Sequence, residues 1–445
     1  MKKIIASVGF AALGVSTLHA QYAPGPAPAS PRGWSVAASV RAFYDDNYLT
    51  EPSSRAVSSY GEEVSPAVSL VTKWNNTALS LSYVYDMLYY DRNDIMDSSH
   101  QFSAYINQQF SERYNLQIGE SFVIAQQPTV QGSGIGVSSG SSSQVLATPL
   151  YSSGDNIHND ASISLTAGLT PSLDLQLSYI NDLYAYQQTF GDVVNFPGMT
   201  LNPSRSALLD RMDQLATVNL NWKMMKQLTW VFGYTYGHTG YTSPEPVVFN
   251  SASYSDPLNI RSQSRDNDSH FFFVGADREL TSQLTGRIRV GGQYVDYYNA
   301  DADSLSPYVD ASLTYVYMKD SSLQAGVTHQ HNATDVVGAI PATTGPNRGQ
   351  PVLDAEATAA YLSVRQKITG GLTGGLMGQY QHSAFNGGTE DGHSEDFFIM
   401  GLNIAYQFNP YLSAEAGYNW NKLVSDVSGR DYTRNIVYIG VRATY

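Results

Sequence analysis

The sequence predicts an all-β protein, a transmembrane antiparallel up-and-down β-barrel of about 18 strands, with 16 or 20 strands as alternatives. Three observations predict it. Apolar residues recur with a period of two along most of the chain after residue 32, and the alternate positions carry mainly Ser, Thr, Asn, Gln and Gly. The third is that short and long connections alternate, as they do in outer-membrane barrels.

Composition narrows the class of protein. The chain has 445 residues, of which 14% are charged, and it contains 32 Tyr and 37 Gly. This is too polar for stacked membrane helices and too poor in charge for a typical soluble protein. The absence of Cys excludes disulfides and thiolate metal sites. The net charge of -14 argues against nucleic acid or anionic lipid as the main partner.

The N-terminus predicts export. Residues 1–20 have Lys2 and Lys3 before a short apolar stretch and then small residues, the pattern of a cleaved secretory signal peptide. Residues 21–32, "QYAPGPAPASPR", predict a Pro/Ala-rich linker. Residues 33–445 are then expected to form a single barrel domain, with no segment apolar and long enough for a membrane helix.

The strand pattern is clear in several segments. Leu79, Leu81 and Tyr83 share one face while Ser80 and Ser82 share the other. A soluble β-sandwich would also alternate, but its outer faces are rich in Lys and Glu. An aliphatic face with aromatic ends, opposite a polar uncharged face, instead predicts lipid outside and water inside.

Connections divide the strands. Short turns are predicted near residues 75–76, 111–112, 170–171, 225–226, 281–282, 319–320, 370–371 and 409–410. Long loops are predicted at about 45–60, 126–155, 191–208, 241–265, 299–304, 332–352, 385–394 and 425–431. Eight short turns and nine hairpins give the count of 18 strands.

The last segment, "NIVYIGVRATY", is predicted to close the barrel against a first strand near residues 34–43, because a free sheet edge cannot be tolerated in hydrocarbon. Val437, Ile439 and Val441 are expected to face lipid, Arg442 to face the lumen, and Tyr445 to lie at the periplasmic headgroup belt.

Three features do not follow the pattern. Glu120 falls on an apolar face, which predicts either a bulge or a position near an interface. Pro66 lies inside a strand and should remove one ladder bond. Residues 271–273, three consecutive Phe, are apolar on both faces.

Inward-pointing charges supply the candidate binding residues. The lumen-lining candidates are Arg41, Asp86, Arg287, Arg289, Arg365, Lys367, Glu415 and Arg442. One interpretation is a charge ring that selects anionic or polyhydroxylated solutes. The alternative, which is the commoner situation for any single residue, is a hydrated interior of ion pairs without a particular substrate. The many tyrosines are expected mainly as interfacial girdles and less often as a stacking track for sugars.

Other chemistry is not indicated. His329 and His331 share a strand face but lack further metal ligands in the pattern, so we expect girdle residues and no metal site. No G-x-S-x-G elbow occurs, and "GSGIGVSSG" misses the dinucleotide-binding spacing. We therefore expect no catalytic residues, no cofactor and no enzyme activity.

Two stretches resemble a known family. The "FYDDNYL" hairpin at residues 43–49 and the hairpin at residues 99–122 are similar to the outer-membrane β-barrel porin family that includes the barrels of exopolysaccharide operons. The resemblance implies a Gram-negative outer membrane and a role linked to extracellular polysaccharide. It also implies that the final strand, through Val437, Ile439, Val441 and Tyr445, is read by the barrel-assembly machinery, with Tyr445 in place of the usual Phe.

The function expected is a water-filled pore for passive or facilitated passage of small polar solutes. One alternative is a barrel for polysaccharide export or surface assembly, and another is a structural or adhesive barrel that acts through the loops at 126–155 and 332–352. Outer-membrane lipids, the assembly machinery and either polysaccharide or small polar solutes are the expected partners. Nucleic acid is not expected, and the oligomeric state is left open.

Overall fold

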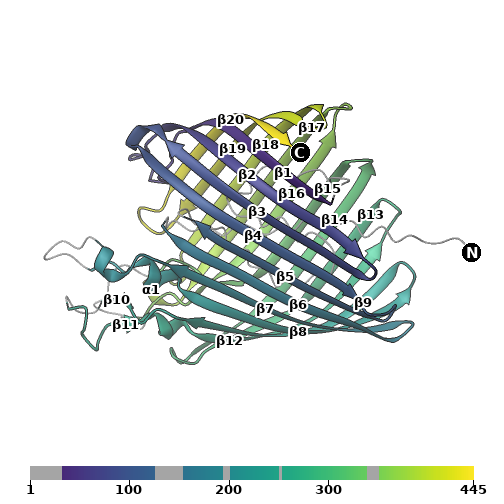
Figure 1. The fold of residues 1–445 in the computed structure, drawn as a ribbon. Coiled ribbons are helices and arrows are strands. Elements are labelled where there is room, and N and C mark those ends of the chain that lie inside the picture. Colours follow the sequence, from purple (N-terminus) through teal and green to yellow (C-terminus); the bar gives the residue numbers. More distant parts are fainter. Residues whose placement is uncertain (1–32, 126–153, 194–200, 250–252, 338–349) are drawn as a thin grey trace, which may run out of the picture.

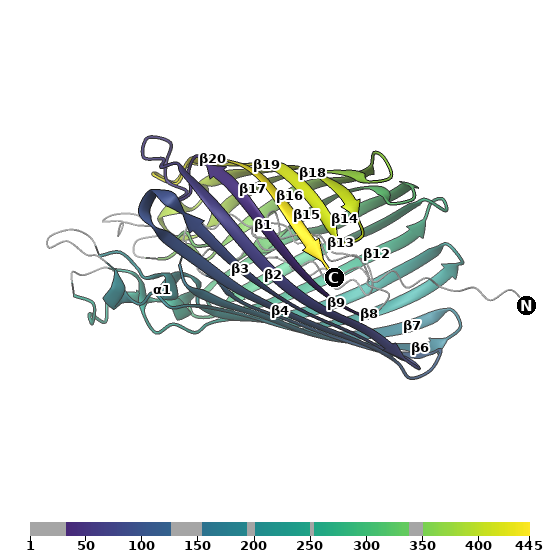
Figure 2. The ribbon, with the colours of Figure 1, turned by 45° about the horizontal axis from the view of Figure 1, so that its top comes forward.

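The structure is a closed antiparallel barrel. The computed structural model describes residues 33–125, 154–193, 201–249, 253–337 and 350–445. In this part of the chain, 18 strands form one sheet in which each strand pairs with its neighbours in sequence and the first pairs with the last. The strands are strongly tilted (Figures 1 and 2). The predicted up-and-down barrel and its strand number are confirmed.

The strands follow in chain order around the barrel. The first nine are β1 (Trp34–Asp45), β2 (Ser59–Trp74), β3 (Thr77–Tyr90), β4 (Ile95–Gln109), β5 (Tyr114–Ala125), β6 (Asn156–Thr170), β7 (Leu173–Tyr186), β8 (Arg211–Met225) and β9 (Leu228–Tyr241). The other nine are β12 (Asn267–Glu279), β13 (Leu284–Tyr297), β14 (Ala302–Met318), β15 (Ser321–Asn332), β16 (Asp354–Lys367), β17 (Leu372–Asn386), β18 (Ser394–Asn409), β19 (Leu412–Ser425) and β20 (Tyr432–Thr444).

Small elements lie in the connections at one end of the barrel. They are the ribbon of β10 (Pro246–Val248) and β11 (Ile260–Arg261), the helix α1 (Arg205–Leu209), and the 3-10 turns η2 (Asp91–Asn93), η3 (Phe190–Asp192), η4 (Ser262–Arg265) and η5 (Gly388–Glu390). Figure 1 shows α1, β10 and β11 together at the end opposite the short turns. No helix in the described ranges is both long and apolar enough to cross a membrane.

All eight predicted short turns are present, from the turn between β2 and β3 to the turn between β18 and β19. The predicted long connections lie at the other end of the barrel, although residues 126–153, 194–200, 250–252 and 338–349 fall outside the described ranges. One outer connection was not predicted. It joins β3 to β4 through η2 and is so short that Asp94 takes a left-handed conformation with φ of 51°.

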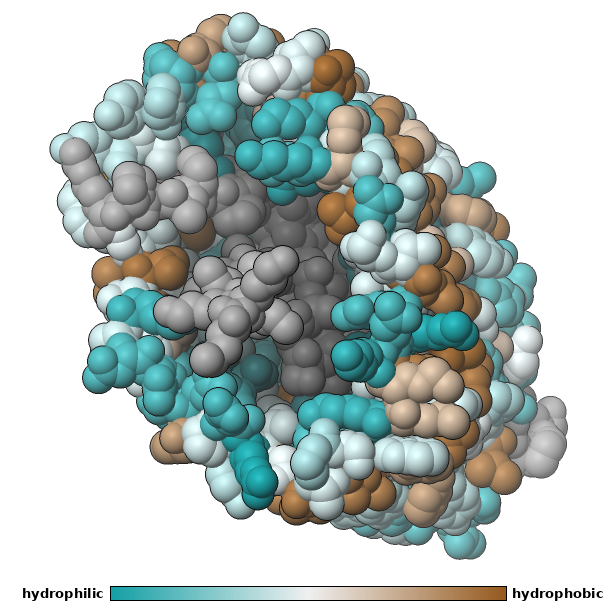
Figure 3. All heavy atoms as spheres, turned by 90° about the vertical axis from the view of Figure 1, so that its right-hand side faces the viewer, coloured by the Kyte–Doolittle hydropathy of each residue, from teal (hydrophilic) through white to brown (hydrophobic). Residues whose placement is uncertain are grey.

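Side chains alternate between lipid and lumen as predicted. On β1, Val36 and Val40 are exposed on the outer face, whereas Ser39 and Arg41 are buried on the inner face. Viewed onto the short-turn end, hydrophilic residues gather around the opening and hydrophobic residues along the outer wall (Figure 3). The barrel therefore has its apolar surface outside.

The first and last strands close the barrel. β1 and β20 pair continuously from Ala37 opposite Thr444 to Asp45 opposite Ile436. Tyr445 extends the ladder, because its N–H donates to the Val36 carbonyl at 2.7 Å and its carbonyl accepts from the Val36 N–H at 3.0 Å. Its ring lies 5.9 Å from the ring of Trp34, so the chain end is packed.

The irregular positions have separate explanations. The β2–β3 ladder skips Ser65 and Pro66, as expected for a residue without an N–H. Register is continuous around Glu120, which excludes a bulge, and Asn159 donates a hydrogen bond to the Glu120 carboxylate.

The three consecutive Phe residues divide between the two faces of the wall. Phe272 is 61% exposed on the lipid face, while Phe271 and Phe273 are buried on the inner face. Phe273 packs across Gly233, where a Cβ atom would come within 2.1 Å of the ring.

Candidate functional site: the lumen wall and its mouth

The inner wall beside the closing seam carries a buried ion-pair network. The Nε of Arg41 donates to Glu415 Oε1 at 2.6 Å, and its Nη1 lies 3.1 Å from Glu63 Oε1. Ser65 donates a further hydrogen bond to Glu63 at 2.9 Å. The sequence predicted Arg41 and Glu415 as lumen residues, but it did not bring them together, since 374 positions separate them. Closure of the barrel creates this pair.

Asp86 and Arg442 lie on the same side of the barrel. Asp86 is 2% exposed on the inner face of β3, and Gln101 on β4 donates to its carboxylate at 3.2 Å. Arg442 faces inward on β20, opposite Ser39 on β1 and Ser413 on β19. The candidates Arg41, Asp86, Glu415 and Arg442 therefore belong to one continuous part of the wall.

The remaining candidates lie on β13 and β16, and most have carboxylate partners. Arg287 is 2.5 Å from Asp310. Arg289 is 2.8 Å from Asp277, and Lys367 is 2.9 Å from Asp320 in a half-exposed pair.

Arg365 faces inward on β16 opposite Ser322 and Gly375. The candidates on β13 and β16 do not form one basic cluster, because Arg287, Arg289 and Lys367 each pair with a different carboxylate. The sequence analysis did not predict the carboxylate partners of these cations, because their proximity depends on register between strands. The wall is accordingly an ion-paired surface with both signs of charge.

Near the long-connection end, a row of stacked side chains crosses four neighbouring strands. His158, Tyr184, Arg211 and Tyr241 occupy consecutive register positions on β6, β7, β8 and β9. The rings of His158 and Tyr184 stack with centroids 4.3 Å apart, and the Arg211 guanidinium lies 4.1 Å from the centre of the Tyr184 ring.

Arg265, at the end of η4, continues the row at 4.0 Å over the Tyr241 ring. Such cation–π stacking holds the wall rigid at this level. The sequence analysis missed this row, since only register aligns its members.

Residues 333–337, which we call the strap, leave β15 and cross the mouth, the long-connection end of the lumen. Arg265, fully buried, donates to the carbonyls of Thr334 at 3.3 Å, Ala207 at 3.0 Å and Leu208 at 2.8 Å. Burial lowers the pKa of the Arg265 guanidinium. One side of the strap is thus fastened to α1 and to the β9–β12 connection.

Asp335 fastens the strap on the other side. Its carboxylate lies 2.9 Å from Nη2 of Arg430, in the β19–β20 connection, and Arg430 also pairs with Glu395 at the start of β18. Burial alone would lower the pKa of Arg430, but the two carboxylates raise it above its ordinary value.

Strand order shows that the strap is held from two sides of the opening. Six strands lie between β12 and β19 one way around the barrel, and eight, β1 to β8, lie between β20 and β9 the other way. The connections that hold the strap are therefore on nearly opposite sides.

Two valines of the strap pack against the surrounding connections. Val337 packs with Ala207 of α1 and with Val247 and Val248 of β10. Val336 packs in a second cluster that includes Phe385 at the end of β17. The strap is thus anchored by apolar contacts as well as by Arg265 and Arg430, and it narrows the mouth.

The two histidines considered as metal ligands pair instead with acidic residues on β16. His329 Nε2 lies 2.9 Å from Glu356, and His331 Nδ1 lies 2.7 Å from Asp354. No group of three or more His, Cys, Asp or Glu side chains placed to hold a metal ion occurs among the described residues.

Comparison with known proteins supports the barrel assignment. Residues 246–445 match the model of the family described as "Putative beta-barrel porin 2". No curated protein matches the chain.

Similar solved structures include OpdK of Pseudomonas aeruginosa, with 11% identity, a TM-score of 0.41, and coverage of 93% of this chain and 100% of OpdK. OccAB3 of Acinetobacter baumannii has 10% identity, a TM-score of 0.41, and coverage of 93% of this chain and 99% of that chain. A variant of the ferric enterobactin receptor PfeA of Pseudomonas aeruginosa has 9% identity, a TM-score of 0.43, and coverage of 92% and 80% respectively. These likenesses are too remote to transfer a substrate.

In outer-membrane barrels the short turns are periplasmic and the long connections are extracellular. The strap lies among the long connections of this barrel. The resemblance to β-barrel porins is thus confirmed for residues 246–445, which form part of the closed antiparallel barrel.

Proposed function

We propose that the chain forms an aqueous pore for small polar solutes, narrowed at its extracellular mouth by the strap. The observation that carries the proposal is the combination of a closed 18-strand barrel, wide enough for a channel, with an inner wall of ion pairs and hydroxyl or amide side chains. Passage through such a water-filled barrel is passive, down the concentration gradient of the solute.

The ion pairs predict weak charge selectivity. Arg41, Arg287 and Arg289 each face a carboxylate within 3.1 Å, so little net field remains to favour anions. This supports the ion-paired interior over the selective basic ring. The test is the reversal potential of refolded protein in a planar bilayer under a KCl gradient. A potential close to zero is expected, and a strong anion preference would contradict weak selectivity.

Conductance tests the pore and the role of the strap together. Arg430→Ala removes the partner of Asp335 and should loosen the strap, which raises single-channel conductance. Lys367→Ala removes an exposed pair at the short-turn end and is the matched control, with little expected change. A complete absence of open-channel steps from protein with heat-modifiable gel migration would remove the pore proposal. Equal single-channel conductance of Arg430→Ala and the parent would show that the strap does not narrow the pore.

Export and assembly form part of the same proposal. Residues 1–20 act as the cleaved signal peptide and residues 21–32 as the linker, both of which lie outside the described ranges. Val437, Ile439, Val441 and Tyr445 serve as the signal for the assembly machinery. Their exposure supports this role, since each is more than half exposed on the lipid face of the last strand or at its end.

No specific observation favours either alternative, polysaccharide export or surface assembly on the one hand and a structural or adhesive barrel on the other. Most of the loop at 126–155 and more than half of the loop at 332–352 fall outside the described ranges. No glycan-binding surface is evident in the part of the wall that the structure describes, where the stacked aromatic row at the mouth is buried.

A further inference from the structure

One seam of the barrel is incomplete at its extracellular end. β14 and β15 pair upward from Met318 opposite Ser321 only as far as Val309 opposite His329. β14 nevertheless continues to Ala302, and over residues 302–307 its ladder is with β13. β15 ends at Asn332 and becomes the strap. Among the described residues, backbone pairing is therefore missing between the upper part of β14 and the end of β15, and we call this place the notch.

Local chemistry explains why the ladder stops. Continued register would place Pro307 opposite His331, and Pro307 has no N–H to donate. The N–H of His331 instead donates to the side chain of Gln293 on β13, at 3.0 Å. Side-chain contacts thus replace the ladder at the end of β15, because the His331 N–H reaches β13 and His331 Nε2 lies 3.4 Å from Ser304 Oγ on β14.

Buried polar side chains close the notch from within. Asp354 lies 2.7 Å from His331 Nδ1, accepts from Asn386 Nδ2 at 2.6 Å, and accepts from the Tyr297 hydroxyl. The side chains of His331 and Asp354 are 3% and 6% exposed. We call these four residues the latch. It joins β13, β15, β16 and β17 by side chains, next to the place where β14 and β15 lack backbone pairing.

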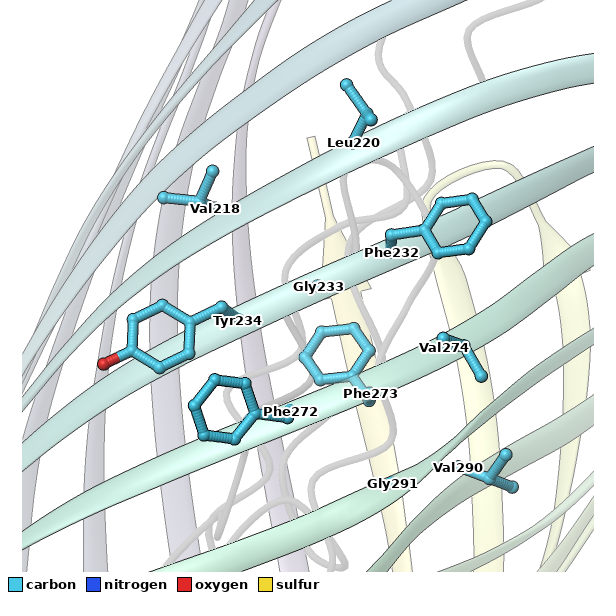
Figure 4. A pocket seen from close by; sticks show the side chains of 10 residues that line it. All are labelled: Val218, Leu220, Phe232, Gly233, Tyr234, Phe272, Phe273, Val274, Val290 and Gly291. Carbon is cyan, nitrogen blue, oxygen red and sulfur yellow. The ribbon is translucent and has the colours of Figure 1, made fainter.

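The outer wall beside the notch carries an apolar groove of about 700 Å³ (Figure 4). Its side chains come from β8, β9, β12 and β13 and include Phe232, Phe272 and Val274. Val290 also lines the groove, and it pairs with Val309, the last residue of β14 below the notch. The groove therefore leads along the lipid face to the lower edge of the notch.

The notch lies at the level of the outer aromatic girdle. Tyr294 on β13 pairs with Leu305, in the part of β14 that has no ladder with β15, and Leu305 is 76% exposed. Girdle tyrosines mark the boundary between acyl chains and headgroups. A molecule in the outer leaflet would present its apolar part to the groove and its polar end to the notch.

We propose that the notch is a lateral entrance through which an amphipathic small molecule passes from the outer leaflet into the lumen. This proposal rests on the proposed pore, because the lumen must conduct what enters. The apolar part of the molecule lies in the groove, and a hydrogen-bonding head group replaces Tyr297 or Asn386 at the Asp354 carboxylate. On the lumen side, the ring of Tyr308 packs against Phe271 and Phe273, which gives the inner end of the path an apolar wall.

Because the exposed edge of β14 contains Pro307, it is better suited to a lateral entrance than to the binding of a peptide as an additional strand. Proline on an edge strand protects it from pairing, because it removes a donor from the row that a partner strand would use. Peptide addition therefore remains an outcome of the test rather than the proposal.

Latch variants test the entrance. Tyr297→Phe removes one hydrogen bond to Asp354 and should increase the uptake of the amphipathic dye N-phenylnaphthylamine roughly two- to tenfold, the effect of one hydrogen bond. The cells should lack other porins, and uptake of arabinose should stay unchanged. Tyr184→Phe is the matched control, because it breaks a part-buried tyrosine–carboxylate hydrogen bond, to Asp182 at 2.8 Å, where β6 and β7 are paired.

A crosslink tests the opposite change. The parent has no Cys, so Ser306→Cys with Asn332→Cys introduces a single disulfide that would close the notch. Thr314→Cys with Gln324→Cys bridges the same two strands where they already pair. Oxidation should reduce dye uptake only for the first pair, and a reducing agent should restore it.

The outcomes separate the entrance from the pore. Loss of arabinose uptake in the parent would overturn the pore, whatever the dye does. Normal arabinose uptake with dye uptake unaffected by Tyr297→Phe and by the crosslink would overturn the entrance alone. Equal increases of both solutes in Tyr297→Phe would also overturn it, because they indicate a loosened mouth. A peptide library that binds the β14 edge and blocks dye uptake without a response to Tyr297→Phe would favour strand addition instead.

Discussion

The β1–β20 and β14–β15 seams of the barrel differ in how completely their strands pair. β1 and β20 lie at the two ends of the chain, yet they pair without interruption, and Tyr445 extends the ladder to Val36. β14 and β15 are joined by a two-residue turn, yet their pairing stops at Val309 and His329. Nearness in sequence does not decide which seam is complete.

The difference follows from what each strand does after the last pair. Nothing draws β20 away from β1, and the buried pair of Arg41 with Glu63 and Glu415 crosses the junction. β15 instead continues into the strap, which Arg265 and Arg430 hold across the mouth. The segment after His329 cannot both pair with β14 and enter the strap. The upper part of β14 therefore lacks a backbone ladder with β15 among the described residues, and side-chain contacts replace it.

Removal of residues 441–445 should have the largest effect, because it takes away half of the β1–β20 ladder and leaves an open edge in hydrocarbon. We expect no folded barrel in the outer membrane, as measured by the heat-modifiable shift on a gel. Tyr445→Phe keeps the terminal ring and should assemble normally. A normal heat-modifiable band from the truncated chain would show that the closing seam does not need its last residues.

Arg41→Ala should destabilise the folded barrel by about 3–5 kcal/mol, because it leaves Glu63 buried without its cation. Denaturant unfolding of the protein in lipid vesicles measures the change. Lys367→Ala, at a half-exposed pair with Asp320, should cost at most about 1 kcal/mol. Similar losses for the two variants would mean that the network at the closing seam is more hydrated than its burial indicates.

Gly417→Ala should weaken the closing side of the barrel by about 1–3 kcal/mol. A Cβ atom at Gly417 would lie 2.4 Å from the ring of Tyr438 on β20, so the ring must move. Gly378→Ala is the control, because the nearest atom there is 4.0 Å away. The same unfolding experiment measures both, and an unchanged stability of Gly417→Ala would show that Tyr438 repacks freely.

Alternation alone was enough to predict most of the fold. It placed Arg41, Val437 and Ile439 on the correct faces and located all eight short turns, because side chains in a strand must alternate between two solvents. The four-residue connection between β3 and β4 was missed, since residues 91–94 continue the polar pattern of a strand end without a Gly or Pro signal.

The site was less predictable, because its geometry depends on register and on connections. The alternation showed that Arg287 faces inward, but its partner Asp310 was not among the predicted lumen residues, and only strand pairing brings the two within 2.5 Å. The row from His158 to Arg265 and the strap follow no period that a sequence displays. Pro307 was the one local sign of the notch, and its meaning depends on the partner strand that it fails to pair with.

The smallest predicted effect concerns α1, to which one side of the strap is fastened. Asp210 follows α1 and accepts hydrogen bonds from the Tyr186 N–H and the Ser206 hydroxyl, both at 2.6 Å. Burial raises the pKa of Asp210 to about 6, above the value of 3.8 expected in the unfolded chain. The folded state therefore favours the protonated acid. The stabilising contribution is complete below pH 3.8 and is lost as the pH rises through about 6.

Docking of α1 should accordingly be tighter at pH 5 than at pH 7, by no more than about 2 kcal/mol after allowance for the partial exposure of Asp210. Hydrogen exchange of the Leu208 and Asp210 amides, which donate to the carbonyls of Ser204 and Ser206, measures this protection. Asp210→Asn cannot titrate and should show equal protection at the two pH values. A pH dependence that persists in Asp210→Asn would assign the effect to another group. It would also show that the attachment of the strap to α1 does not depend on the Asp210 carboxyl. Protection that falls on acidification of the parent would reverse the sign of the argument and contradict a raised pKa.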